Sequence, residues 1–166
     1  MIRLHLLPSI SLLESHTVAA IEIWRVLEML PMAKRFSFYG EWKDTFYRRI
    51  PALAVRKAEA ERDVKSILRR LSTQNVKKLG KTFAKIAHTN PTVVFHVTLN
   101  QIQSYDNLIS PVLEATRYLT DFGYDVLAYS VLDALSSDRP KTKDDGTSTA
   151  LWLQGSFLSP PVIHIG

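Results

Sequence analysis

The hydrophobic pattern of residues 90–112, NPTVVFHVTLNQIQSYDNLISPV, fits both a strand and a helix. Apolar and mostly polar residues alternate from Val93 to Asn100, as they do in a strand with one buried face. However, Asn90 is followed by a proline, and Ser110 is followed by another proline 20 residues later. Asn and Ser are good N-cap residues and proline suits the first turn of a helix, so both pairs indicate helix starts.

The helical interpretation also accommodates more of the apolar residues. In a helix, Phe95, Leu99 and Ile102 share one stripe, whereas a strand of residues 93–100 leaves Ile102 without a place. Several β-branched residues lower the intrinsic helix propensity of this stretch, so such a helix depends on packing against its neighbours. We therefore predict an inner helix over residues 92–104, with Phe95, Leu99 and Ile102 buried.

Similar patterns predict helices along most of the chain. Asn75 and Asp125 are expected to cap helices, Gly123 to end one, and Gly40 to be a weak point in the helix that follows Pro31. A capping box from Ser11 to Glu14 is expected near the first helix. The helix starts are predicted near residues 9, 31, 51, 75, 91, 111, 125 and 147.

These starts also predict the architecture. Alternate starts lie 34 to 44 residues apart, which is the range of two-helix repeats. The predicted fold is all-α, an α-solenoid-like stack of antiparallel helical pairs over residues 1–154, truncated at both ends. Residues 155–166, with two prolines and no helical pattern, are expected to form an irregular tail that does not pack. No apolar run approaches the roughly 18 residues of a membrane-spanning helix, so no membrane partner is predicted.

Positive charge is concentrated in one part of the chain. The net charge is +5, but residues 34–85 alone hold 15 Lys and Arg against 5 Asp and Glu, whereas residues 90–166 hold 4 against 8. Within residues 56–85, six cations flank a single turn between two predicted helices, and we call them the basic ridge: Arg69, Arg70, Lys77, Lys78, Lys81 and Lys85. Such a ridge attracts nucleic-acid phosphates or an acidic protein surface, unless it is only a solvated helix face.

Catalytic and metal-binding patterns are missing from the sequence. There is no cysteine, Gly-rich phosphate loop, HExxH motif or nucleophile elbow. The five histidines are scattered and expected at the surface or at polar edges, and Asp144 and Asp145 are expected in a solvated loop. Aromatic residues of the segment 36–47 are interleaved with cations, and we expect them to form core with a basic rim rather than to stack bases. No catalytic residue, metal or cofactor is predicted.

Several long stretches resemble one protein family. They are FYGEWKD, SILRRLSTQNVKKLGKTFAKIAHTNPTVVF, LNQIQSYDNLISPV and RYLTDFGYDVLAY, in the same order as in the central helical region of the THO complex subunit 2 family. The resemblance covers about residues 20–154. After LWLQ the family continues into further helices, but this chain does not show their pattern, so a truncated form is expected.

The resemblance implies a function without catalysis. Members of this family are long α-solenoid scaffolds of the THO/TREX mRNA export complex in the nucleus, where transcription is coupled to mRNA packaging and export. The implied partners are the other THO subunits and, through the complex, an export adaptor and a DEAD-box RNA-dependent ATPase. The family's basic tail has no counterpart here, so the alternative, a direct RNA- or DNA-binding module, rests on the basic ridge of residues 56–85.

Overall fold

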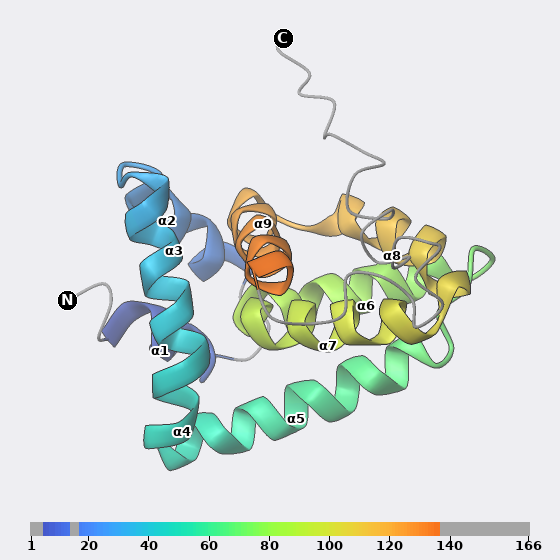
Figure 1. Ribbon diagram of the computed structural model, residues 1–166, viewed down its shortest axis with the longest axis horizontal. Coiled ribbons are helices and arrows are strands. Elements are labelled where there is room, and N and C mark those ends of the chain that lie inside the picture. The colour runs from blue at the N-terminus through green and yellow to red at the C-terminus, as the bar shows by residue number, and fades with distance from the viewer. Residues whose placement is uncertain (1–4, 14–16, 137–166) are drawn as a thin grey trace, which may run out of the picture.

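The computed structural model describes residues 5–13 and 17–136, and within these two ranges it contains helices and no strand (Figure 1). The predicted all-α fold is therefore confirmed. None of the helices in these ranges combines the length and apolar character that crossing a bilayer requires. The predicted helix start near residue 147 and the tail of residues 155–166 lie outside the described residues.

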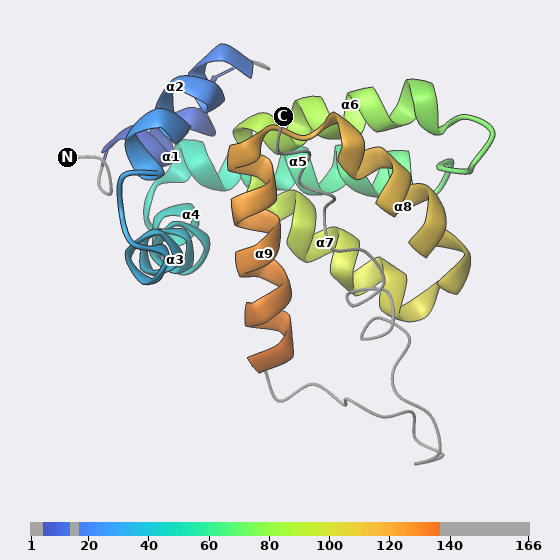
Figure 2. The same cartoon turned by 90° about the horizontal axis from the view of Figure 1, so that it is seen from above.

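One helix, α7 (Pro91–Ser104), lies inside the fold. It packs against α5 (Pro51–Leu68), α6 (Val76–Thr89) and α9 (Asp121–Ser136). Figure 1 shows α7 above α5 and below α9, and Figure 2 shows α6 and α7 diverging from a junction beside α9. The stretch that could have been a strand is thus the helix around which the others assemble.

The burial of α7 explains how a sequence rich in β-branched residues is held in a helix. Phe95, Leu99 and Ile102 are 1, 6 and 7% exposed, as predicted. Burial extends beyond this stripe, because Thr92, Val93, Val94, Val97 and Thr98 are buried as well. Contacts on several sides compensate for the low helix propensity, so the inner position predicted for this helix is confirmed.

The N-terminal helices differ from the prediction in their boundaries. They are α1 (Leu7–Ile10), α2 (Thr17–Leu27) and α3 (Met32–Glu41), followed by a π-helical turn, η2 (Trp42–Phe46), and the short α4 (Tyr47–Arg49). The helix predicted to start near residue 9 is thus replaced by α1 and the separate α2. Gly40 does not interrupt α3, because helical structure continues past it into η2. Pro51 begins α5 as predicted.

The segment after Tyr105 corrects three predicted helix boundaries. Helix α8 (Ile109–Ala115) continues from a 3-10 turn, η3 (Asp106–Leu108), so Ser110 is not an N-cap. A second 3-10 turn, η4 (Thr116–Tyr118), leads to α9. There the Thr120 hydroxyl accepts the backbone N–H of Gly123, so Gly123 lies within the first turn and Asp125 follows it. A β-carbon on Gly123 would lie 3.3 Å from Cβ of Leu119, and this close approach explains the glycine.

Helices α5 to α9 pack in a repeating order. Each of α5, α6 and α7 contacts the second helix after it, as stacked helical pairs do. In addition, α9 contacts α2 and α3, which brings the N-terminal helices beside the last described helix. The solenoid itself stays a prediction.

Candidate functional site

The basic ridge lies where α5 passes into α6. Arg69 and Arg70 follow the last residue of α5, and the four lysines belong to α6. All six side chains are exposed. The ridge cations thus lie on two consecutive helices and the turn between them, around the end of α5 that leads into α6, at the right of Figure 1.

Helix α6 has one apolar face and one face that is almost entirely lysine. Its inward residues include Phe83, Ala84 and Ala87, which are 1, 2 and 0% exposed. Its exposed positions are Lys77, Lys78, Lys81, Thr82 and Lys85. Since the inward face packs on α7 and α8, these lysines are held toward solvent on a fixed support.

The turn before α6 is ordered by Asn75, but not in the way predicted. Its side-chain oxygen accepts the backbone N–H of Ser72 at 2.9 Å, and its amide nitrogen donates to the carbonyl of Arg70 at 2.6 Å. Asn75 occupies the N-cap position without a side-chain capping bond. The prediction of a capping side chain is wrong because these turn contacts use both polar atoms, and the same contacts fix the path from Arg70 to Lys77.

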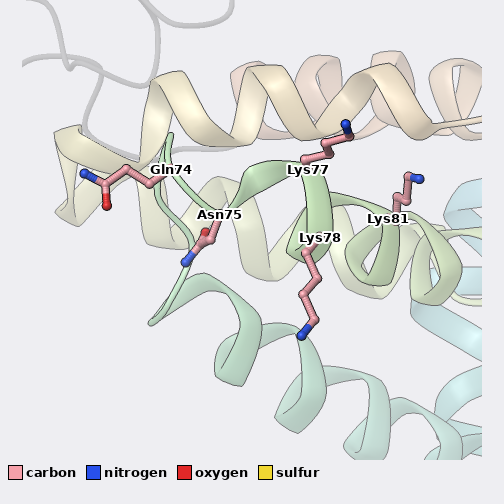
Figure 3. Close-up of a pocket in the computed structure, with 5 residues that line it drawn as sticks. All are labelled: Gln74, Asn75, Lys77, Lys78 and Lys81. Carbon is pink, nitrogen blue, oxygen red and sulfur yellow. The ribbon is translucent and has the colours of Figure 1, made fainter.

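A hollow of about 390 Å³ opens beside this turn. Its lining consists of Gln74, Asn75, Lys77, Lys78 and Lys81, which are all polar or cationic. Figure 3 shows Lys78 directed toward α5, whereas Lys77 and Lys81 point to the other side of α6. The residues that line the hollow carry ammonium and amide donors, which suit an anionic oxygen group, and these donors point in different directions.

Among the Lys and Arg of residues 56–85, only the six ridge cations and Lys65 lack an ion pair to a described residue. On α5, Arg56 pairs with Glu59 at 3.1 Å and Lys57 with Glu61 at 3.9 Å. Arg62 pairs with the adjacent Asp63. Among the described residues, no ion pair involves any of the six ridge cations, so the first half of the 56–85 stretch is locally neutralised and the second half is not.

The aromatic segment 36–47 forms core, as predicted. Tyr39, Trp42 and Tyr47 are 0, 0 and 2% exposed. The nearby Lys43 donates to Asp133 at 2.7 Å, and Tyr39 stacks edge-on against Phe122 of α9. These rings are therefore occupied by packing rather than free to stack on bases.

Arg35 joins the same segment to the start of α9. Its Nε and a terminal nitrogen each donate to the Asp125 carboxylate at 2.8 Å. This hydrogen bonding is the main reason that the pKa of Arg35 is raised. The Tyr39 hydroxyl donates to the same carboxylate, and burial above all raises the pKa of that phenol. Asp125, predicted as a cap, instead binds two side chains about 90 residues away in sequence.

A buried polar cluster was not visible in the sequence. The Tyr47 hydroxyl donates to the side-chain oxygen of Asn90 at 3.1 Å and lies 2.8 Å from the Ser11 hydroxyl. Asn90 precedes α7, as expected for an N-cap, but its side chain makes this tertiary contact and no capping bond. The cluster ties α1, α4 and α7 together and has a structural role.

One histidine is buried, contrary to the prediction. His88 is 6% exposed, burial lowers its pKa, and its Nδ1 has no hydrogen-bond partner among the described residues. It lies on the inward side of α6, where packing outweighs polarity. Within residues 5–13 and 17–136, no group of three or more His, Asp or Glu side chains could hold a metal ion. Asp144 and Asp145 lie outside the described residues.

Comparison with known proteins identifies the family. Residues 1–81 match the family described as THO complex subunit 2 N-terminus, and residues 83–155 match the family described as Transcription- and export-related complex subunit. The two matches meet in the middle of α6. They follow one another without overlap and together extend over nearly the whole chain.

Curated relatives agree with both family matches. THO complex subunit 2 of Homo sapiens is 41% identical over 150 residues, and that of Arabidopsis thaliana is 42% identical over 150 residues, each covering 90% of this chain. The Saccharomyces cerevisiae protein is 35% identical over 153 residues, or 92% of this chain. The chain spans only 9, 8 and 10% of the length of these three relatives. These similarities show that the chain belongs to the THO complex subunit 2 family.

Proposed function

We propose that this chain contributes to a non-catalytic scaffold subunit of the THO complex and acts by protein–protein association in the nucleus, in transcription-coupled mRNA packaging and export. The observation that carries the proposal is the similarity to THO complex subunit 2 across 90% of the chain, from a plant to a mammal. The description of one matching family, a transcription- and export-related complex subunit, supports the same role.

The partners follow from this role. We propose the other THO subunits as direct partners, with an export adaptor and a DEAD-box RNA-dependent ATPase associated through the complex. A scaffold role accords with the groups whose pKa values are shifted most, Tyr39 and Tyr47, because both are buried and hydrogen-bonded to residues of other helices. Their environment holds helices together instead of exposing a reactive group.

The exposed side of α2 is our candidate for the association surface. Val18 and Ile21 are 68 and 41% exposed on this helix, and Met29, just after it, is 81% exposed. Apolar side chains on one accessible helix face suit packing against a helix of a THO subunit, since protein interfaces bury an apolar centre. The Arg25–Glu22 ion pair crosses this face and supplies a polar element.

Co-purification from nuclear extract tests the proposal. The tagged chain is recovered with and without nuclease, and the other THO subunits are identified by mass spectrometry. Their recovery after nuclease treatment supports direct association. Their absence, or a recovery that nuclease removes, contradicts it.

Two variants locate the association surface in the same assay. We expect Val18→Glu combined with Met29→Glu to release the subunits, because a partner would have to bury two carboxylates. The matched control is Val55→Glu, at a 58% exposed position on α5, which should retain them. Equal recovery with both variants would exclude the α2 surface while leaving the association itself intact.

A further inference from the structure

We propose that the basic ridge is a sequence-independent binding site for the phosphodiester backbone of nucleic acid. This site is separate from the association surface on α2, and it can bind whether or not the chain assembles with other subunits. The proposal rests on the uncompensated charge of the ridge, on the lack of exposed large hydrophobic side chains within residues 56–104, and on the arrangement of the ridge donors.

The charge of the ridge is not compensated by its surroundings. From Val64 to Tyr105 the chain contains no Asp or Glu, but it contains seven Lys and Arg, the six ridge cations and Lys65. Glu114 lies on α8, which packs against α6, and forms no ion pair with a ridge lysine. By contrast, Arg35 and Lys43 pair with acids on α9. An uncompensated group of cations raises the local concentration of polyanions.

The composition of the surface favours nucleic acid over an acidic protein. Protein interfaces are anchored by apolar or aromatic side chains at their centre. Among the described residues between Val55 and Tyr105, no large hydrophobic side chain is exposed. Residues 56–104, which include the ridge, therefore offer charge and hydrogen-bond donors without an exposed apolar anchor of their own, and such a surface suits phosphate contacts.

The spacing of the lysines suits a row of phosphates. Lys77, Lys81 and Lys85 follow one another at four-residue intervals, which places them about 6 Å apart along the axis of α6. The row is about 12 Å long and matches three to four phosphates, given one phosphate per about 3.4 Å along a strand of a duplex. Lys78 and the hollow beside Gln74 add donors on the side toward α5.

Base recognition is not part of the proposal. The aromatic rings of segment 36–47 are packed in the core, and none of the exposed positions of α6 is aromatic. Stacking on aromatic side chains is the usual source of base contacts to single strands. Binding through the ridge should therefore depend on the backbone, with little preference for sequence.

Helix stability does not explain the lysines either. Lys77 and Lys78 lie in the first turn of α6, which contains no acidic residue. The N-terminal end of a helix carries partial positive charge, so cations there are unfavourable and anions favourable. A phosphate bound at this end would remove an unfavourable interaction that the free protein retains.

Fluorescence anisotropy with the purified chain tests the site. The probes are labelled single-stranded RNA, single-stranded DNA and duplex DNA of equal length, and polyglutamate of equal charge is the competing polyanion. We expect dissociation constants of about 1–100 µM at physiological salt, similar for RNA and DNA. If four lysines contact a single strand, the logarithm of the association constant should change with the logarithm of the salt concentration with a slope of about −2.8. Binding should then be about 50-fold weaker at 200 mM than at 50 mM salt.

Two matched sets of substitutions separate the ridge from net charge. The ridge set changes Lys77, Lys78, Lys81 and Lys85 to Gln, and the control set changes Arg25, Arg49, Lys57 and Arg62 to Gln. Each set removes four positive charges and lowers the net charge from +5 to +1. We expect the ridge set to weaken binding at least tenfold and to flatten the salt dependence, whereas the control set changes affinity less than threefold.

A third set, with Arg at the same four ridge positions, should retain binding, and circular dichroism verifies that all the variants are folded. The proposal is overturned if no nucleic acid binds, or if the ridge and control sets weaken binding equally, since net charge alone would then account for it. Tighter binding of polyglutamate than of nucleic acid would also overturn it, in favour of an acidic protein partner.

Discussion

Replacing Gly80 by Ala is expected to destabilise the protein, although Ala is the better helix former. Gly80 lies on the inward side of α6, where α8 and η4 approach closely. A β-carbon there would lie 3.0 and 3.1 Å from two ring carbons of Tyr118 and 3.3 Å from the α-carbon of Ala115. Carbon atoms pack best at about 3.5–4.0 Å, so the new methyl group would be too close to all three atoms.

The magnitude follows from two opposing terms. Ala in place of Gly in a helix interior contributes about 1 kcal/mol of stability. Overpacking of this kind costs about 1–3 kcal/mol, and the upper half applies because Ala115 presents backbone rather than a movable side chain. We therefore expect Gly80→Ala to lower the free energy of unfolding by about 1 kcal/mol.

Gly40→Ala is the matched control, since Gly40 also lies inside a helix. Its nearest neighbour would be the Tyr129 hydroxyl oxygen at 3.3 Å, at the far end of a side chain that can shift slightly. Gly40→Ala should therefore retain most of the propensity gain. The two variants should differ by about 2 kcal/mol, or about 1 M in the urea midpoint at a typical dependence on denaturant.

Urea denaturation followed by circular dichroism measures both variants, and a double-mutant cycle with Tyr118→Ala tests the cause. If the Tyr118 ring is the obstacle, Gly80→Ala should cost less in the Tyr118→Ala background. The reasoning is refuted if Gly80→Ala is as stable as Gly40→Ala, or if removing the ring leaves its cost unchanged.

Three further predictions concern charged and titratable groups. Asp125→Asn should lower the free energy of unfolding by about 3 kcal/mol in the same urea assay, because it removes the carboxylate partner of the mostly buried Arg35. Glu22→Gln breaks an exposed ion pair and should lower that free energy by less than about 1 kcal/mol. His88→Leu should flatten the pH dependence of the free energy of unfolding between about pH 7 and 5, because burial lowers the pKa of His88 below its ordinary 6.5 and protons therefore favour the unfolded chain as the pH falls. The same dependence of that free energy on pH in the original protein and the variant would contradict this. Lys78→Glu should raise the stability measured by thermal unfolding by about 0.5 kcal/mol, because a carboxylate suits the first turn of α6, and it should weaken nucleic-acid binding, because a carboxylate repels phosphate. A decrease in stability would count against the role of the helix dipole.

The helices were predictable where hydrophobic periodicity and prolines agree. Pro51 and Pro91 each begin a helix as predicted, and α6 begins at Val76, directly after the expected Asn75. In these segments the local preference of the chain and its tertiary packing favour the same structure. The alternating pattern of α7 was misleading only when taken alone, because a helix buried on several sides need not show a polar face.

Predicted helix caps and helix ends were wrong where the residue makes a different contact in the fold. Asn75 and Asn90 precede helices, but one orders a turn and the other binds Tyr47. Gly123 lies inside α9, where its close approach to Leu119 favours a residue without a β-carbon. Such outcomes depend on which residues meet in the folded chain, and contacts such as Arg35 with Asp125 join residues 90 positions apart. No local pattern specifies them.

The ridge was predictable in its residues but not in its extent. The sequence grouped the four lysines of α6 with Arg69 and Arg70 around one turn, and all six side chains are exposed. The ion pairs along α5 then reduce the long basic stretch to its second half. What the structure adds is the surrounding surface, because the neighbouring helices decide which side chains around α6 are exposed and which cations are paired.

The two faces of α6 suggest why the ridge lies on this helix. The inward face is fixed by close contacts at Gly80 and by the buried Phe83, so the helix cannot rotate without losing its packing on α7 and α8. A rigid support keeps the four lysines together despite their mutual repulsion, which would favour separation in a mobile segment. Packing of the inward face therefore holds the four lysines in an arrangement that their mutual repulsion disfavours. Residues whose interactions lower local stability are expected at functional sites.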